Sequence, residues 1–270
     1  MLVNNIMSAQ KNIKVVILCG GLGTRMREET EFRPKPMVTI GGRPIVWHIM
    51  KIYSYYGFKD FVLCLGYKGG MIKEYFYNYE ILNSDFTIEY GNGKHIDVYN
   101  NHGENGWRVT LVDTGDKALK GARLKRAQRY IDGETFMMTY GDGVSDINIK
   151  SLLAFHEQHG RLVTVSGVHP TSRFGELKAK GDKVVKFMEK KDVGPSLVSG
   201  GFFVCNSGIF DYLTYDEDCD FEIGALERIA EDSDLMVFRH SGFWAGMDTL
   251  RDVDYLNNLW HEGNAKWKVW

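Results

Sequence analysis

A run of apolar residues that leads directly into a glycine-rich turn constrains this chain most. Residues 15–19 read Val-Val-Ile-Leu-Cys, a pattern typical of a parallel strand buried on both faces. The turn that follows holds Gly20, Gly21 and Gly23, and glycine lets the backbone approach a ligand closely. Because backbone amides in such a turn can bind phosphate oxygens, the sequence predicts an α/β fold with a phosphate-binding loop after its first strand.

Two cationic side chains accompany this turn. Arg25 follows Thr24 at its exit, and Lys35 lies between two prolines ten residues later. A guanidinium can bind phosphate through two nitrogens, and an ammonium acts as a movable point charge. A tight strand-to-helix connection would explain the glycines alone, but it needs neither cation. The segment contains neither G-x-x-x-x-G-K-[ST] nor a complete G-x-G-x-x-G, the two best-known phosphate-loop motifs. It therefore favours a different type of triphosphate site.

The composition limits the partners and the location. The 33 basic and 35 acidic side chains give a formal net charge of −2, which predicts binding to neither nucleic acid nor an anionic membrane surface. No stretch approaches the roughly 20 apolar residues of a membrane span. The four cysteines are scattered, without metal-binding or redox spacing. We therefore expect a protein of the reducing cytoplasm.

The length of 270 residues suits one large domain. Residues 1–12 precede the first strand and are expected to form a loose N-terminal extension, followed by a single domain over 13–270. Residues 86–112 are the least regular part, and their polar, glycine-rich turns fit either a mobile flap or a subunit contact. Elsewhere the apolar patterns predict strands at 61–65, 135–140, 162–168, 200–205 and 235–238, a hairpin over 173–190, and helices at 45–56, 71–79, 120–130, 147–158, 221–230 and 250–260.

Two aspartates stand out near predicted element ends. Asp142 lies between two glycines just beyond the strand at 135–140, where a hard cation can reach its carboxylate. It could instead cap the helix that starts near residue 146. A triphosphate requires a cationic partner, which favours the metal interpretation for Asp142. For the second carboxylate, the residues alone favour a helix cap at Asp248-Thr249.

A basic helix at 120–130 supplies one more candidate. Four cations occur within seven residues there, and such a cluster usually forms a solvated helix face. We expect this for Lys125 and Arg129. Arg123 lies at the helix start and is the better candidate for a ligand contact.

Together these motifs resemble the signature of the sugar-phosphate nucleotidylyltransferases, G-G-x-G-T-R followed by P-K-P. Within that family, the combination is most similar to the enzymes that join CTP to glucose 1-phosphate. The resemblance implies a Rossmann-like nucleotidyltransferase fold, with a mixed, mostly parallel sheet flanked by helices and a small C-terminal sugar-binding portion. It covers nearly the whole chain, with further similar segments in the same order at 47–50, 66–69, 112–115, 123–126, 140–143, 173–175, 200–204, 242–244 and 247–252.

The resemblance also implies roles for the two parts of the domain and for single residues. Residues 13–145 would mainly bind nucleotide, and 146–270 would mainly bind sugar phosphate and form subunit contacts in a homo-oligomer, a hexamer in this branch. Mg²⁺ would be the cofactor, held by Asp142 and Asp248. Catalysis would rest on Arg25, Lys35, Asp142 and Lys190, the last holding the sugar phosphate. The substrate-binding residues would be Leu18, Gly20, Gly21, Leu22, Gly23, Thr24, Arg25, Thr114, Arg123, Tyr140, Ser199 and Gly201.

The implied reaction is attack by the sugar phosphate on the α-phosphorus of CTP, which forms CDP-glucose and releases pyrophosphate. Three differences from the family pattern keep alternatives open. Ser199 stands where asparagine is usual near the sugar, Ala122 stands where glycine is usual, and residues 89–101 look unlike the corresponding segment. One alternative is cytidylyl transfer to another phosphorylated acceptor, and the other is a non-catalytic protein that binds a nucleotide sugar. The presence of every catalytic and metal-binding side chain favours an enzyme.

Overall fold

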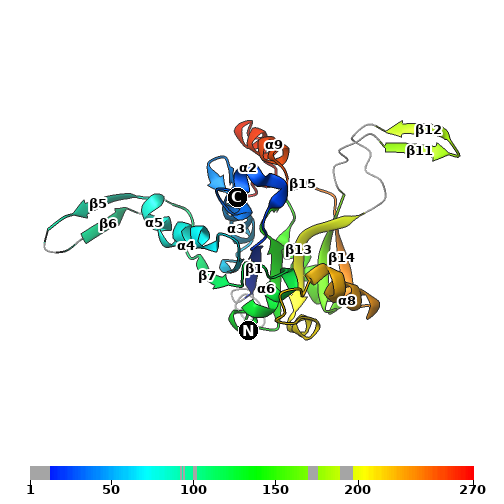
Figure 1. The fold of residues 1–270 in the computed structure, drawn as a ribbon, viewed down its shortest axis with the longest axis horizontal. Helices are drawn as coiled ribbons and strands as arrows, with labels where there is room; N and C mark the ends of the chain where they lie inside the picture. The colour runs from blue at the N-terminus through cyan, green and yellow to red at the C-terminus, as the bar shows by residue number, and fades with distance from the viewer. Residues whose placement is uncertain (1–12, 92, 94, 100–101, 170–175, 189–196) are drawn as a thin grey trace.

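The computed structural model describes residues 13–91, 93, 95–99, 102–169, 176–188 and 197–270. Its centre is a seven-stranded sheet in the order β14-β10-β13-β8-β1-β4-β7 (Figure 1). In this sheet β13 runs antiparallel to its neighbours β10 and β8, and all other pairs are parallel. The predicted mixed, mostly parallel sheet is therefore confirmed. The strands are β1 (Lys14–Cys19), β4 (Asp60–Leu65), β7 (Arg108–Asp113), β8 (Thr135–Tyr140), β10 (Val163–Val168), β13 (Val198–Asn206) and β14 (Leu235–His240).

Helices cover both faces of the sheet. Because successive strand residues point to opposite faces, Val15 and Ile17 of β1 join one core while Val16 and Leu18 join the other. Strand β1 is thus buried on both sides, which explains its continuous apolar sequence. The first core is closed by α3 (Ile45–Tyr55), α7 (Ile149–His159) and α9 (Leu250–His261), and the second by α6 (Lys120–Ala127) and α8 (Glu227–Glu231).

The remaining elements are short. The helix predicted at 120–130 changes to a 3-10 turn after residue 127, and the helix predicted at 221–230 opens at Ile223 and Gly224, whose backbone angles are not helical. Among the described residues, no helix has the length and apolar character needed to cross a bilayer. The short elements are η1 (Thr24–Met26), α2 (Arg27–Thr30), η2 (Lys35–Met37), β2 (Thr39–Ile40), β3 (Arg43–Pro44), α4 (Gly69–Tyr77), α5 (Tyr79–Leu82), η3 (Gln128–Tyr130), β9 (Gly143–Ser145), η4 (Ser207–Tyr212), η5 (Phe221–Leu226) and β15 (Trp244–Gly246).

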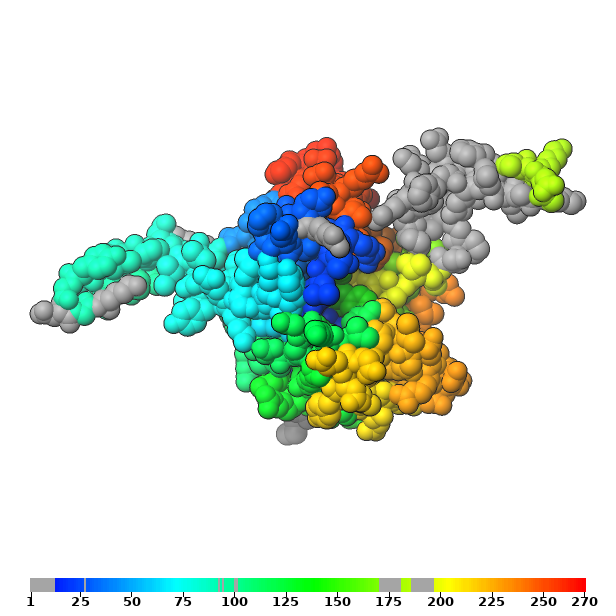
Figure 2. All heavy atoms as spheres, viewed as in Figure 1, coloured from blue at the N-terminus to red at the C-terminus, as the bar shows by residue number. Residues whose placement is uncertain are grey.

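Two hairpins extend away from the body of the protein (Figures 1 and 2). One is β5 (Asp85–Glu89) with β6 (His95–Tyr99), and the other is β11 (Glu176–Lys180) with β12 (Lys183–Met188). The last part of the irregular segment 86–112 does not join the first hairpin, because it forms β7, the edge strand of the main sheet. The first hairpin exposes Phe86, Val98 and Tyr99, so this two-stranded ribbon has no core of its own.

His48 on α3 is fully buried beneath the C-terminal tail. Its Nε2 lies 2.8 Å from the carbonyl oxygen of Ile40, which can only accept, so Nε2 carries the proton and donates. Its Nδ1 accepts a hydrogen bond from Trp267 Nε1 at 3.4 Å. The ring of Trp260 lies edge-on at a centroid distance of 4.9 Å. Burial lowers the pKa of His48 from 6.5 to about 4, and this imidazole is therefore neutral at physiological pH.

Acidification is expected to destabilise the fold through His48. The unfolded chain takes up a proton near pH 6.5, whereas the folded chain resists it until about pH 4, so the unfolded state binds more protons in this window. Up to about 3 kcal/mol of the free energy of unfolding is lost as the pH falls through it. Urea unfolding of the wild-type and His48→Gln proteins between neutral pH and pH 4 measures the difference. An equal loss in both proteins would contradict the assignment.

Candidate active site

The site lies where the carboxyl ends of β1 and β8 meet. These strands are parallel neighbours, with Leu18 opposite Tyr140, so the turns that follow them lie side by side. The amide of Gly141 donates to the carbonyl oxygen of Leu18 at 3.1 Å. A Cβ at position 141 would lie 2.7 Å from that oxygen, so this close approach of the two backbones requires glycine. A cleft of about 550 Å³ opens at this edge and is lined by both turns.

Asp142 and Asp248 approach each other at this cleft although 106 positions separate them in the sequence, 248 minus 142. Strands β9 and β15 follow Asp142 and precede Asp248, and they pair antiparallel with Gly143 opposite Gly246. The amide of Met247 also donates to the carbonyl oxygen of Asp142 at 2.8 Å. The small β9–β15 pair therefore brings the two carboxylates together.

Neither Asp142 nor Asp248 is the N-cap residue of the helix that follows it, α7 or α9. The N-cap of α7 is Asn148, whose side chain accepts from the amide of Ser151 at 3.0 Å. The N-cap of α9 is Thr249, which forms a reciprocal capping box with Asp252. The helix cap predicted at Asp248-Thr249 is therefore confirmed at Thr249, and the carboxylates of Asp142 and Asp248 line the cleft.

Lys35 joins the two carboxylates. Its Nζ lies 2.5 Å from Asp142 Oδ2 and 2.7 Å from Asp248 Oδ1. Arg25, whose side chain is mostly exposed, places Nη1 at 3.1 Å from Asp248 Oδ2. Burial alone would lower the pKa of Lys35, but the charges of Asp142 and Asp248 and their hydrogen bonds outweigh it, and the pKa is raised. Lys35 therefore stays an ammonium ion at physiological pH.

The two aspartates have the chemistry to hold a divalent metal ion. One oxygen of Asp142 and one of Asp248 point to the same place, and in this structure the Lys35 ammonium lies between them. Mg²⁺ is typically held by one or two carboxylates together with substrate phosphates and waters. Within the described ranges, no three side chains of the His, Cys, Asp or Glu types gather closely enough to hold a metal by themselves. The remaining ligands must then come from substrate and water.

The predicted phosphate loop forms the wall beside Lys35. Gly23 has a φ of +62°, in the left-handed region that favours glycine, and its carbonyl oxygen accepts from the amide of Met26 at 2.9 Å. This tight turn exposes Gly21, Leu22, Thr24 and Arg25. Gly20, Gly21 and Arg25 line the cleft itself. The loop is thus accessible to a ligand along most of its length.

Arg123 lines the cleft and links the end of β4 to the turns that follow β1 and β7. Its side chain is buried, and its terminal nitrogens donate to the carbonyl oxygens of Gly20 at 2.7 Å, Leu65 at 3.1 Å and Gly115 at 2.8 Å. It also donates to Thr114 Oγ1 at 3.0 Å, and that hydroxyl in turn donates to Leu65 at 2.6 Å. Burial lowers the pKa of Arg123. Of the two predicted ligands, Arg123 lines the cleft and supports the 20–25 turn through Gly20, and Thr114 contacts that arginine.

The other predicted residues that the structure describes also line the cleft. Tyr140 ends β8, and its ring packs against Gly201 of β13, which has a φ of +76°. A Cβ at position 201 would lie 2.9 Å from that ring, so a larger residue would clash with it. Ser199 is exposed and lines the cleft, and its Oγ accepts from the amide of Gly201 at 3.4 Å. Leu18 forms part of the floor. Lys190 lies outside the described residues.

Comparison with known proteins identifies the family. Residues 14–260 match the sequence profile described as nucleotidyl transferase. The chain belongs to this family. It is 48% identical over 259 residues to a glucose-1-phosphate cytidylyltransferase of Salmonella typhimurium, covering 96% of this chain and 100% of the relative. It is 43% identical to a probable glucose-1-phosphate cytidylyltransferase of Bacillus subtilis, with the same coverage.

Solved structures agree on the nucleotidyl transferase fold. The inositol-1-phosphate CTP transferase of T. maritima superimposes with a TM-score of 0.65, covering 96% of this chain and 98% of that one. Its sequence identity is only 16%, so this likeness concerns the fold alone. The fold predicted from the sequence resemblance is confirmed by both comparisons.

Two charged side chains at the cleft of this nucleotidyl transferase were not among the predicted site residues. Lys120 begins α6 and Glu222 lies in η5, and both line the cleft with Tyr140. In the sequence, Glu222 looks like an ordinary acidic residue in the first turn of a helix capped by Asp220. Lys120 looks like one of several cations on a basic helix. No local pattern signals that the two would meet, because they are 102 residues apart.

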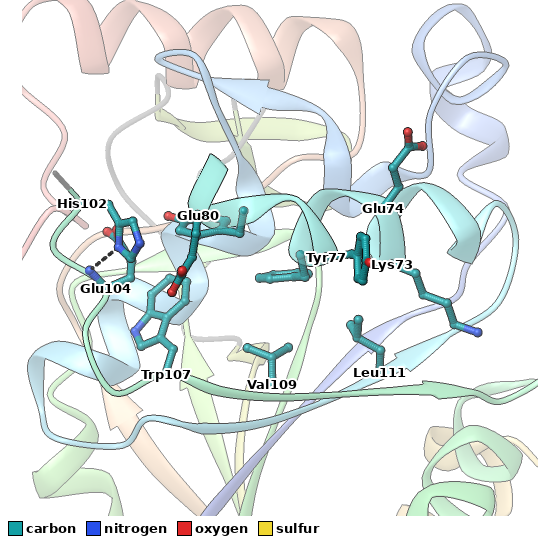
Figure 3. Close-up of a pocket in the computed structure, with 11 residues that line it drawn as sticks. Lys73, Glu74, Tyr77, Glu80, His102, Glu104, Trp107, Val109 and Leu111 are labelled. Atoms are coloured by element: carbon teal, nitrogen blue, oxygen red, sulfur yellow. Dashed lines mark hydrogen bonds and ion pairs between the residues drawn. The ribbon is translucent and has the colours of Figure 1, made fainter. Parts of the chain in front are cut away.

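A second hollow of the nucleotidyl transferase, of about 710 Å³, lies between α4, α5 and β7 (Figure 3). Aromatic and aliphatic side chains dominate it, and Glu104 at its rim pairs with Lys51 at 3.2 Å and with His102 at 3.4 Å. None of the residues that line the phosphate cleft lines this hollow. It is therefore separate from the site of Asp142. Its lining is Lys73, Glu74, Phe76, Tyr77, Tyr79, Glu80, His102, Glu104, Trp107, Val109 and Leu111.

Proposed function

We propose that this chain transfers the cytidylyl group of CTP to glucose 1-phosphate, forming CDP-glucose and pyrophosphate. The observation that carries the proposal is the convergence of Lys35, Asp142 and Asp248 beside an exposed phosphate loop. The names of the relatives that are 43% and 48% identical support both the nucleotide and the acceptor.

The reaction is an in-line displacement at the α-phosphorus of CTP. The bond to the acceptor phosphate oxygen forms as the bond to pyrophosphate breaks, without a protein nucleophile. Because both reactants are anions, catalysis rests on positioning and on neutralising charge. Mg²⁺ on Asp142 and Asp248 would supply positive charge between the two phosphate groups. Arg25, Lys35 and the amides of the 20–25 turn stabilise the charge that develops on the leaving pyrophosphate.

The acceptor side of the reaction involves the second half of the chain. We assign Lys190 to the acceptor phosphate, and Ser199 to the sugar pocket, where it replaces the asparagine usual in the family. This replacement favours a test of other phosphorylated acceptors. The cleft has lining residues from both 13–145 and 146–270, which supports the division into a nucleotide part and a sugar-phosphate part. A non-catalytic binding protein would not need Lys35 and two carboxylates on one position.

Subunit contacts and location complete the proposal. The β5–β6 hairpin exposes Phe86, Val98 and Tyr99, and the aromatic hollow lies near its base, features that suit burial in a homo-oligomer such as a hexamer. A net charge of −2 supports neither nucleic acid nor an anionic membrane as a partner. The scattered cysteines, three of which are buried, suit a reducing cytoplasm.

Pyrophosphate release tests the reaction directly. The purified protein is assayed with Mg²⁺, each of the four ribonucleoside triphosphates and thymidine triphosphate, and a panel of sugar 1-phosphates. We expect turnover with CTP and glucose 1-phosphate above every other pair. Turnover with CTP and a different acceptor would indicate that the pocket at Ser199 selects another sugar phosphate. Absence of turnover with every pair would contradict the proposed enzyme.

A further inference from the structure

One wall of the cleft carries a carboxylate that the proposed reaction does not use. Glu222 Oε1 accepts from the hydroxyl of Tyr140 at 2.6 Å, and Oε2 accepts from the ammonium of Lys120. That ammonium also lies 5.4 Å from the centroid of the Tyr140 ring. The side chains of Glu222 and Lys120 are 41% and 35% exposed. Glu222 is therefore held in one orientation and is still accessible from the cleft.

The local backbone of η5 directs Glu222 to this wall. Asp220 accepts from the amides of Glu222 and Ile223 at 2.8 and 2.9 Å, which starts the helical turn. The turn then opens at Ile223 and at Gly224, which has a φ of 95°. Glu222 is thus the last residue before the helical backbone is interrupted at Ile223. A continuous helix would place its side chain in a different direction.

Close packing of α6 brings Lys120 to the same wall. A Cβ on Gly121 would lie 2.8 Å from the carbonyl oxygen of Cys219, so only glycine permits this approach. The amide of Ala122 donates to the same oxygen at 3.0 Å. The pairing of Lys120 with Glu222 is therefore fixed by backbone contacts.

A carboxylate in a phosphate-binding cleft limits what can lie beside it. Since like charges repel most where little water screens them, we expect no phosphate of either substrate against Glu222. A neutral group with hydroxyl donors suits it better. Each carboxylate oxygen can accept about two hydrogen bonds, and Tyr140 and Lys120 use one on each oxygen. One acceptor position then remains on each oxygen, which matches two neighbouring hydroxyl groups.

We propose that Glu222, oriented by Tyr140 and Lys120, binds two neighbouring hydroxyl groups of a substrate sugar ring. The inference rests on the proposed function, because the transfer of a nucleotide to a sugar 1-phosphate brings such rings into this cleft. The ribose of CTP and the hexose of the acceptor both carry a vicinal diol. Glu222 is then a specificity-determining residue, and Tyr140 and Lys120 are positioning residues.

Deoxy substrates combined with a Glu222→Gln variant test this contact. The KM values of both proteins are measured for CTP and 2′-deoxy-CTP, and for glucose 1-phosphate and its deoxy analogues. We expect Glu222→Gln to raise the KM of one substrate about tenfold and to lose the wild-type preference for that substrate over its deoxy form. Loss of selectivity in the CTP pair assigns the contact to the ribose, and loss in the acceptor series assigns it to the hexose. Unchanged KM values and selectivity for both would overturn the inference.

Two variants and one binding measurement complete the design. Tyr140→Phe removes the hydroxyl that orients the carboxylate and should shift selectivity in the same direction by a smaller factor. Glu231→Gln makes the same charge change on the exposed surface of α8 and should leave both KM values unchanged. Calorimetry with CDP-glucose needs no turnover, so it separates failure of this inference from failure of the proposed function. Equal Kd values for the wild-type and Glu222→Gln proteins would overturn the contact even if the wild-type protein releases no pyrophosphate.

Discussion

Replacing Asp142 with asparagine is expected to lower kcat by about 10²- to 10³-fold while the protein stays folded. The substitution keeps the shape of the side chain but removes one of the two negative charges that converge at the Lys35 position. It therefore weakens the site for a divalent cation and leaves the phosphates without their charge partner. Pyrophosphate release is measured over a magnesium titration, and chelation of the metal should reduce the wild-type activity in the same way.

The control for this prediction is Asp211→Asn, which makes the same change at an exposed position on η4. It should keep wild-type turnover and the wild-type dependence on magnesium. Thermal melting of both variants shows whether the fold is intact. Wild-type turnover by a folded Asp142→Asn protein would remove Asp142 from the metal site.

Replacing Arg123 with alanine is expected to reduce the free energy of unfolding by about 3 kcal/mol and to raise the KM of CTP. Arg123 is buried and donates to carbonyl oxygens at the end of β4 and in two turns, and its loss leaves several of these acceptors without a partner. For a domain of this size the melting temperature should fall by about 6 to 12 °C. Because one of the acceptors is Gly20, the phosphate loop should also lose its fixed position.

Arg129→Ala is the matched control for this prediction. Arg129 lies in η3, directly after α6, is exposed, and contacts the neighbouring Tyr130. Its removal should change neither the melting temperature nor the KM of CTP appreciably. If Arg123→Ala melted like the wild-type protein, the three segments would be held by other contacts, and the assignment of Arg123 as their support would be wrong.

The nucleotide side of the site could be predicted largely from local sequence. The apolar strand, the glycine turn and Lys35 between prolines are contiguous signals, and Asp142 directly follows a recognisable strand. Each of these residues reaches the cleft because parallel strands end at the same edge of the sheet. The resemblance to a family supplied the substrates and the role of Asp248.

The remaining features depend on contacts between distant segments. Asp248 looks like a helix cap in the sequence, and only the pairing of β9 with β15 brings it to Asp142. Arg123 lines the cleft as its place at a helix start suggests, but local sequence does not indicate that its buried guanidinium also donates to backbone carbonyls of distant segments. The pair of Lys120 and Glu222 depends on the approach of α6 to η5, which no periodicity encodes.

The reversed direction of β13 has a consequence for how this enzyme scaffold can diversify. In an entirely parallel sheet, only segments that follow a strand reach the catalytic edge. Here the residues at the beginning of β13, Ser199 to Gly201, reach it because that strand runs the other way. The connection that precedes β13 can therefore change in length or sequence without shifting the register of β1 against β8. Evolution could therefore exchange the proposed acceptor pocket while the proposed nucleotide-binding residues stay constant.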